Sequence, residues 1–175
     1  MKAFYSDTFV LPLPEGHRFP MAKYRRLRER LVAERVLSES DLEVPDPAPW
    51  EAIRLAHAPA YVAEVAEGRL SAAAQRRIGF PWTPSMVERS RRSVGATIAA
   101  AAEVLAGGRV AANLAGGTHH AFRDRGEGYC VFNDVAVAAL LLLEGANVGA
   151  VTVVDCDVHQ GDGTAAIFRD DSRVY

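Results

Sequence analysis

The sequence lacks most of the features that mark secreted, membrane-bound or repetitive proteins. Only two cysteines occur among its 175 residues, Cys130 and Cys156, so a scaffold held together by several disulfides is excluded. No apolar run is long enough to span a bilayer, and neither a signal-peptide pattern nor an internal repeat is found. We therefore expect a cytoplasmic protein with reduced thiols and no membrane association.

An excess of charge of one sign is also missing. The chain has 20 Lys and Arg residues against 22 Asp and Glu residues, a formal net charge of −2 at pH 7. Direct nucleic-acid binding is disfavoured, because it usually requires a basic face. With 49% hydrophobic residues, the chain can bury a core as a single domain over residues 1–175.

Apolar periodicity and turn residues predict that strands and helices alternate. The stretch 149–154 has the β-branched content of a strand buried on both faces of a parallel sheet. Residues 172–175 resemble the opening of a further strand. The other strands are expected at 2–5, 42–44 and 109–114, and helices at 21–36, 50–55, 59–67, 71–77, 84–106 and 135–144. The pattern predicts an α/β fold with a mainly parallel sheet.

Three polar side chains at alternate positions directly follow the predicted strand 149–154. In an extended chain Asp155, Asp157 and His159 leave the backbone on the same face. Unpaired carboxylates crowded there are unfavourable, and a divalent cation removes that cost. Carboxylate oxygen with imidazole nitrogen is a usual ligand set for catalytic zinc and also suits iron, manganese or cobalt. We therefore favour a metal site over a solvated strand end.

A histidine pair follows the predicted strand 109–114 in a similar way. Gly116 and Gly117 allow the backbone to leave the sheet, and His119 and His120 come soon after. Ligands of open parallel sheets bind at the carboxyl ends of strands, so we expect this pair to converge with the polar segment after residue 154. The alternative is a polar loop without a catalytic role.

Taken together, these motifs resemble the zinc-dependent histone deacetylase family, and in particular its bacterial and class IV-like members. The resemblance implies the three-layer α/β/α arrangement of the arginase/deacetylase fold. The motifs that carry it run along nearly the whole chain, and the last three are highly specific in combination. They lie at 17–24 (HRFPMAKY), 79–82 (GFPW), 116–120 (GGTHH), 126–130 (GEGYC) and 155–164 (DCDVHQGDGT).

The resemblance assigns roles to individual side chains. It implies that Asp157 and His159 bind Zn²⁺, with Fe²⁺, Mn²⁺ or Co²⁺ as other metals, and that His119 and His120 form the catalytic acid/base pair. In that family a metal-bound water attacks an amide carbonyl that the metal polarises, and a histidine protonates the leaving amine. The implied substrates are an acetylated lysine peptide, a polyamine or another small acylated amine.

Four further residues receive supporting roles from the resemblance. Asp155 and Asp162 would orient the two imidazoles, since a carboxylate that accepts one ring N–H fixes the tautomer and raises the basicity of the other nitrogen. Gly128 and Tyr129 would line a narrow tunnel for the acyl-lysine chain. From the residues alone, Asp162 could equally be a turn residue or a helix cap, and the segment at 128–130 an ordinary loop.

Other polar and sulfur-containing residues are interpreted as structural. Cys130 and Cys156 are expected to be small buried side chains without a nucleophilic role. His57 is expected to be a histidine of the core or of a helix start. Asn133 and Asp134 are expected to cap the helix at 135–144.

The family's second aspartate ligand and its transition-state tyrosine have no match in the sequence. Tyr175 is too close to the metal motif to be that tyrosine. We therefore expect a deacetylase-like domain that is truncated at its C-terminal end. Two alternatives stay open. One is an inactive fragment or scaffold, and the other is an arginase-like ureohydrolase with two metals, which the adjacent His119 and His120 disfavour.

Overall fold

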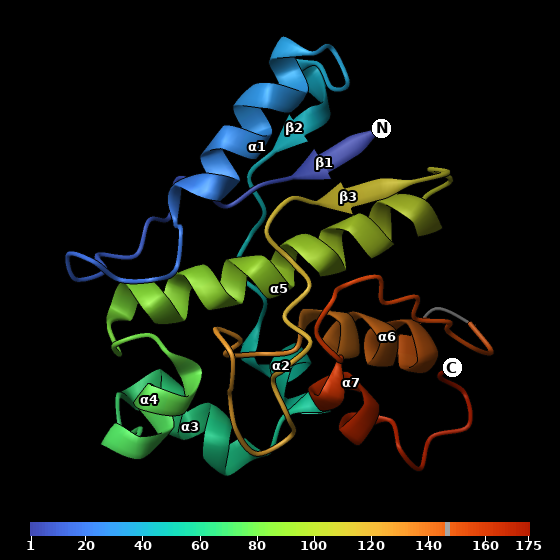
Figure 1. Cartoon of the computed structure of the whole chain (residues 1–175). Helices are drawn as coiled ribbons and strands as arrows, with labels where there is room; N and C mark the ends of the chain where they lie inside the picture. Colours follow the sequence, from blue (N-terminus) through green and yellow to red (C-terminus); the bar gives the residue numbers. More distant parts are fainter. Residues whose placement is uncertain (146–147) are drawn as a thin grey trace.

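A computed structural model describes residues 1–145 and 148–175. Within them a parallel sheet has the strand order β2 (Leu42–Glu43), β1 (Lys2–Phe4), β3 (Ala111–Asn113). The register pairs Ala3 with Leu42 on one side and with Ala112 on the other. In Figure 1 this sheet lies between α1 and the long helix α5. The predicted α/β class with a parallel sheet is confirmed.

Helices are the main regular secondary structure of the described chain, and each predicted helix is present with small shifts at its ends. Ser71 and Thr83 precede α4 and α5, and their hydroxyl groups accept a hydrogen bond from the first turn. No described helix is long and apolar enough to cross a membrane. The helices are α1 (Ala22–Ala33), α2 (Trp50–Ala56), α3 (Pro59–Glu67), α4 (Ala72–Ile78), α5 (Pro84–Leu105), α6 (Asp134–Gly145) and α7 (Asp162–Ile167), with a 3-10 turn at Glu39–Asp41.

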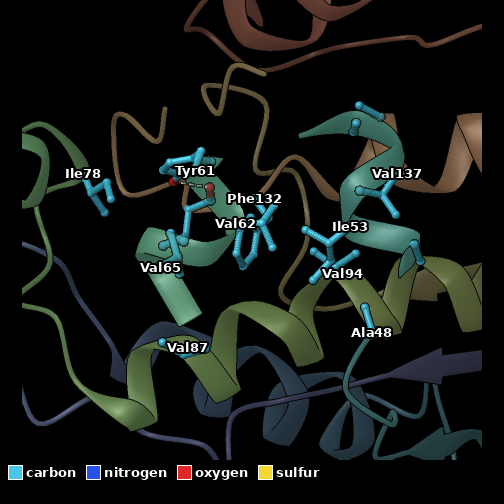
Figure 2. Packing of buried hydrophobic residues seen from close by; sticks show 14 of the residues in the cluster. Ala48, Ile53, Tyr61, Val62, Val65, Ile78, Val87, Val94, Phe132 and Val137 are labelled. Atoms are coloured by element: carbon cyan, nitrogen blue, oxygen red, sulfur yellow. Dashed lines mark hydrogen bonds between the residues drawn. The ribbon is translucent and has the colours of Figure 1, made fainter. Parts of the chain in front are cut away.

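The hydrophobic core is centred on helices rather than on the sheet. Side chains from α2, α3, α5 and α6 meet the loop before α6, as Figure 2 shows for Ile53, Val62, Val94, Phe132 and Val137. These side chains are almost completely buried. Burying an aliphatic or phenylalanine side chain contributes about 1.5–3 kcal/mol. This helical core supports the loops that carry the polar motifs.

The prediction of a fully buried strand at 149–154 is wrong for the described residues. Val151 forms an isolated parallel bridge with Val174, and Val154 is 79% exposed. The predicted opening of a strand at 172–175 is seen in this pairing, where the Tyr175 N–H donates to the Val151 carbonyl at 3.0 Å. The β-branched sequence gives extended backbone, but burial requires neighbouring strands, and these two segments lie outside the three-stranded sheet.

Candidate active site

The chain leaves β3 through a loop that contains two adjacent glycines. Gly117 has a φ of +79°, in the left-handed region that favours glycine. A Cβ atom added to Gly116 would lie 2.5 Å from Oδ2 of Asp134, closer than real contacts allow. The turn therefore depends on both glycines. It places His119, which is buried, and His120, which is half-buried, beside the segment that precedes α7.

Two histidine–aspartate pairs join this loop to the segment 155–162. His119 Nδ1 lies 2.6 Å from Asp155 Oδ2, and His120 Nδ1 lies 2.8 Å from Asp162 Oδ1. The centroids of the two imidazole rings are 4.3 Å apart. Because an ionised carboxylate can only accept a hydrogen bond, each Nδ1 carries the proton. The Nε2 atom of each ring is then the nitrogen that can take up or release a proton.

The surroundings keep both carboxylates ionised. The hydrogen bond from His119, together with one from the backbone N–H of Asp157, holds the pKa of Asp155 below its usual value. Burial opposes ionisation of Asp162, but hydrogen bonds from His120 and from the Gly163 backbone outweigh it, so its pKa is lowered as well. An ionised carboxylate at Nδ1 stabilises the imidazolium that forms when Nε2 is protonated. The pairs are therefore suited to acid/base chemistry.

Asp157 and His159 lie next to these pairs and are open to solvent. His159 Nδ1 is 2.8 Å from Asp157 Oδ1, and the His159 backbone N–H donates to the same oxygen at 2.8 Å. The two hydrogen bonds lower the pKa of Asp157. The side chains are 71% exposed for His159 and 51% exposed for Asp157. The centroids of the His159 and His120 rings are 6.0 Å apart, so Asp157 and His159 lie beside the histidine pair.

These two donors fit part of a catalytic metal site. Their imidazole–carboxylate chemistry suits zinc, and a bound cation would replace the proton that Nδ1 of His159 shares with Oδ1 of Asp157. Catalytic zinc normally takes three protein ligands. Within residues 1–145 and 148–175, no group of three His, Cys, Asp or Glu side chains is placed to hold a metal ion. Asp157 and His159 are therefore two candidate donors, fewer than the three that a catalytic zinc site usually has.

Gly128 and Tyr129 border the histidine pair. A Cβ atom on Gly128 would lie 2.9 Å from Cδ2 of His120, so the backbone passes directly against that ring. The ring of Tyr129 packs against Phe19 and Phe80, with centroid distances of 4.9 and 5.2 Å. Two backbone hydrogen bonds to carbonyls at the end of α4 anchor this turn. Phe19, Phe80 and Tyr129 therefore form an aromatic wall beside the histidine pair.

A model of the histone deacetylase domain matches residues 17–175. The chain belongs to the histone deacetylase family. The match includes both histidine–aspartate pairs, the Asp157–His159 segment and the aromatic wall. The predicted family resemblance is therefore confirmed.

Individual relatives agree with this membership. An uncharacterised protein of Picosynechococcus sp. is 44% identical over 174 residues, which cover 98% of this chain and 57% of that protein. The acetoin utilization protein AcuC of Bacillus subtilis is 32% identical over 169 residues, which cover 91% of this chain and 43% of AcuC. The crystal structure of a deacetylase homolog from Aquifex aeolicus matches with a TM-score of 0.83 and 27% identity, covering 99% of this chain and 49% of the homolog. The chain thus spans about half the length of the relatives it matches.

The sequence analysis does not identify one buried cationic side chain, Arg89. Arg89 is 7% exposed and lines a cavity of about 40 Å³ together with Thr118 and Tyr129. Its guanidinium donates to two backbone carbonyls of the N-terminal segment. A basic residue within a helix usually indicates a solvated surface. The burial of Arg89 could have been predicted from helical spacing, because Arg89 lies on the same face of α5 as the buried Met86 and Ser93.

Cys130, Cys156 and His57, three of the residues with a predicted structural role, differ in their environments. Cys130 is buried as predicted, and burial raises the pKa of its thiol to about 12, which argues against a nucleophile. His57 is completely buried, as predicted for a core histidine. The prediction for Cys156 is wrong, because this thiol is exposed. It lies in the segment at 155–159, which the described residues leave open to solvent.

Proposed function

We propose that this chain supplies the proton-transfer pair and two metal ligands of a zinc-dependent deacetylase centre. The observation that carries the proposal is the pairing of two histidines with two aspartates, His119 with Asp155 and His120 with Asp162. These pairs lie directly beside Asp157 and His159. Membership of the histone deacetylase family supports the same reaction. The reaction is hydrolysis of the acetyl amide of a linear amine.

In this proposal the residues of the chain have distinct tasks. When bound, zinc would supply a Lewis acid and lower the pKa of a water molecule. The Nε2 atoms of His119 and His120 take up the proton of the attacking water and return a proton to the leaving amine. Asp155 and Asp162 keep Nδ1 of each ring protonated and hold each ring in place. Each transfer of this kind contributes about 10²–10⁴-fold to the rate.

The proposed substrates are an acetylated lysine peptide, an acetylated polyamine or another small acylated amine. The aromatic wall of Phe19, Phe80 and Tyr129 offers an apolar border for a methylene chain. Related proteins carry the names histone deacetylase 2 in Arabidopsis thaliana and polyamine deacetylase HDAC10 in Homo sapiens. These names support acylated lysine and acylated polyamines as the two classes to test first.

A second candidate is an inactive fragment or scaffold. The donor set favours it, because in the part of the chain that the structure describes Asp157 and His159 are two candidate donors and catalytic zinc usually has three protein ligands. The arginase-like alternative needs donors for two metals, and the family match favours the deacetylase.

Two measurements separate the candidates. The purified 175-residue chain is titrated with zinc and assayed with a fluorogenic acetyl-lysine peptide and with an acetylated polyamine. A fusion of the chain to the part of the Picosynechococcus protein that it does not cover is assayed in parallel. We expect weak zinc binding and no turnover for the chain alone, and turnover for the fusion that a chelator abolishes and zinc restores.

Each contrary result has a definite meaning. Full activity of the fusion after exhaustive chelation would contradict the metal assignment. Robust turnover by the chain alone would show that a further residue completes the site, and would exclude the scaffold. A folded fusion that binds zinc tightly but turns over none of the substrates would favour the scaffold.

A further inference from the structure

Two buried polar residues lie where α6 starts, one just before the helix and one at its first position, and their side chains reach the loop that carries the histidine pair. Asn133 is 0% exposed and Asp134 is 1% exposed. Burying an amide or a carboxylate is unfavourable unless hydrogen bonds satisfy its polar atoms. The sequence predicts that both side chains cap α6. Only Asn133 forms a capping hydrogen bond, in which its Oδ1 accepts from the Ala136 backbone N–H at 3.0 Å.

Asp134 holds the loop on the side that precedes the histidines. Its carboxylate accepts hydrogen bonds from the backbone N–H groups of Gly117 and Thr118, at 3.2 and 2.7 Å. It also accepts from the hydroxyl groups of Thr118 and Thr97, both at 2.5 Å. The Asp134 backbone N–H donates back to Thr118 Oγ1 at 3.1 Å. The backbone directly before His119 is therefore fixed by one carboxylate.

Asn133 holds the loop on the side that follows. Its Nδ2 atom donates to the Ala121 carbonyl at 3.1 Å and to Thr164 Oγ1 at 2.9 Å, with the His119 carbonyl at 3.5 Å. Thr164 belongs to α7, the helix that begins at Asp162. The same amide therefore links the loop of His120 to the helix that carries the carboxylate partner of His120.

His57 extends this contact to the next loop residue. Its Nε2 accepts the Asn133 backbone N–H at 2.9 Å, and its Nδ1 donates to the Phe122 carbonyl at 2.9 Å. The histidine is buried and belongs to the end of α2, within the helical core. The loop backbone from 117 to 122 is thus tied to the core by three buried side chains.

We propose that Asn133 and Asp134 are positioning residues that fix the backbone on both sides of His119 and His120. A histidine side chain has only two torsions, so its ring follows its backbone closely. A shift of about 1 Å is enough to break a hydrogen bond of ordinary length. Holding residues 117–118 and 121 therefore keeps both rings on their aspartates. The proposal rests on the proposed function for the meaning of those pairs, while the placement can be tested without turnover.

The first test is Asn133→Asp in the 175-residue chain. Aspartate keeps the oxygen that caps α6 but replaces the Nδ2 donor by an acceptor that faces the Ala121 carbonyl and Thr164. Ser71→Ala is the control for a general loss of stability, because it removes the cap of α4 and no hydrogen bond of residues 117–122. The readout is nuclear magnetic resonance of chain labelled with ¹⁵N-histidine. An Nδ1–H proton held on a carboxylate exchanges slowly with water.

We expect slow exchange at His119 and His120 in the unaltered chain and in Ser71→Ala. In Asn133→Asp we expect the exchange rate of both protons to rise by about tenfold or more, because the hydrogen bonds from Asn133 to the Ala121 carbonyl and to Thr164 are lost. Wild-type exchange in a folded Asn133→Asp variant would overturn the positioning role.

A second pair of variants carries the test if Asn133→Asp does not fold. Thr118→Val removes the hydroxyl that bonds Asp134, and Thr118→Ser retains it. Fast exchange in the valine variant with recovery in the serine variant supports the proposal, and equal exchange in both overturns it. Fast exchange in the unaltered chain would overturn the histidine–aspartate pairs and with them the proposed function. An inactive fusion with the expected exchange pattern would contradict the proposed function alone.

Discussion

His120 and Asp162 are 42 residues apart in the sequence, and 2.8 Å separates Nδ1 of the imidazole from Oδ1 of the carboxylate. The histidine belongs to the loop after β3, and the aspartate is the first residue of α7. Neither segment can form this contact by itself. The hydrogen bond between His120 and Asp162 therefore exists only when α7 is seated against the loop.

Replacement of the proton-transfer residue should separate turnover from metal binding. We expect His120→Ala to lower the turnover of the active fusion by about 10²–10⁴-fold, the usual contribution of general acid/base catalysis. Its zinc affinity should stay close to that of the parent, because His120 is assigned to proton transfer and not to the metal. Steady-state kinetics and metal analysis check this. Loss of the metal from this variant would instead make His120 a ligand.

Removal of a proposed metal donor should weaken zinc binding. We expect Asp157→Asn and His159→Ala each to weaken zinc binding by the 175-residue chain by about tenfold or more, since each deletes one of two donors. Asp170→Asn removes an exposed carboxylate of the same C-terminal region and serves as the control. Zinc titration with a competing chromophoric chelator measures all three variants. Unchanged affinity in the two site variants would remove Asp157 and His159 from the metal site.

Acid should destabilise the fold through His57. Burial lowers the pKa of this histidine to about 4, so between that value and the ordinary pKa near 6.5 the unfolded chain binds the proton more readily than the folded chain does. The stability contributed by neutral His57 is therefore complete above pH 6.5 and is lost as the pH falls toward 4, by roughly 3 kcal/mol in all. Urea denaturation at a series of pH values measures this slope.

The control for this dependence of stability on pH is His57→Asn, which retains a donor for the Phe122 carbonyl but cannot titrate. We expect it to be less stable at neutral pH and to show a flatter dependence between pH 6.5 and 4. Asp41 and Asp171, whose pKa values are lowered to about 2, act at lower pH and leave this window clear. Parallel curves for the two proteins would show that His57 does not cause the acid sensitivity.

A side chain at position 128 should disturb the histidine pair. Gly128 has a φ of +55°, and a Cβ atom there would meet the His120 ring at 2.9 Å. We expect Gly128→Ala to cost about 1–2 kcal/mol in backbone strain and also to speed the exchange of the His120 Nδ1 proton. Gly16→Ala imposes the same kind of strain at a φ of +78° with no neighbour within 4 Å. Equal exchange in both variants would contradict the close approach of Gly128 to His120.

The sequence by itself determined the family and the order of the helices, and it predicted the chemistry of the site. The order of helices follows from apolar spacing and from caps such as Ser71 and Thr83, because these signals act within a few residues. The histidine pair and the segment from Asp155 to His159 indicate metal-assisted hydrolysis, because imidazole and carboxylate groups are the usual donors of a catalytic metal site. Family membership could be read from the same motifs.

Other features were decided only by the tertiary structure. Asp162 could have been a turn residue, and it is the partner of His120 because α7 packs against a loop far away in the sequence. The stretch 149–154 has a buried composition but an exposed Val154, since burial depends on neighbours and not on the strand itself. Asn133 and Asp134 look like a helix cap in the sequence, but apart from the Asn133 contact with Ala136 their side chains bond residues 12 to 37 positions away. Local patterns fix local conformation, whereas the partners of a buried polar group depend on the path of the whole chain.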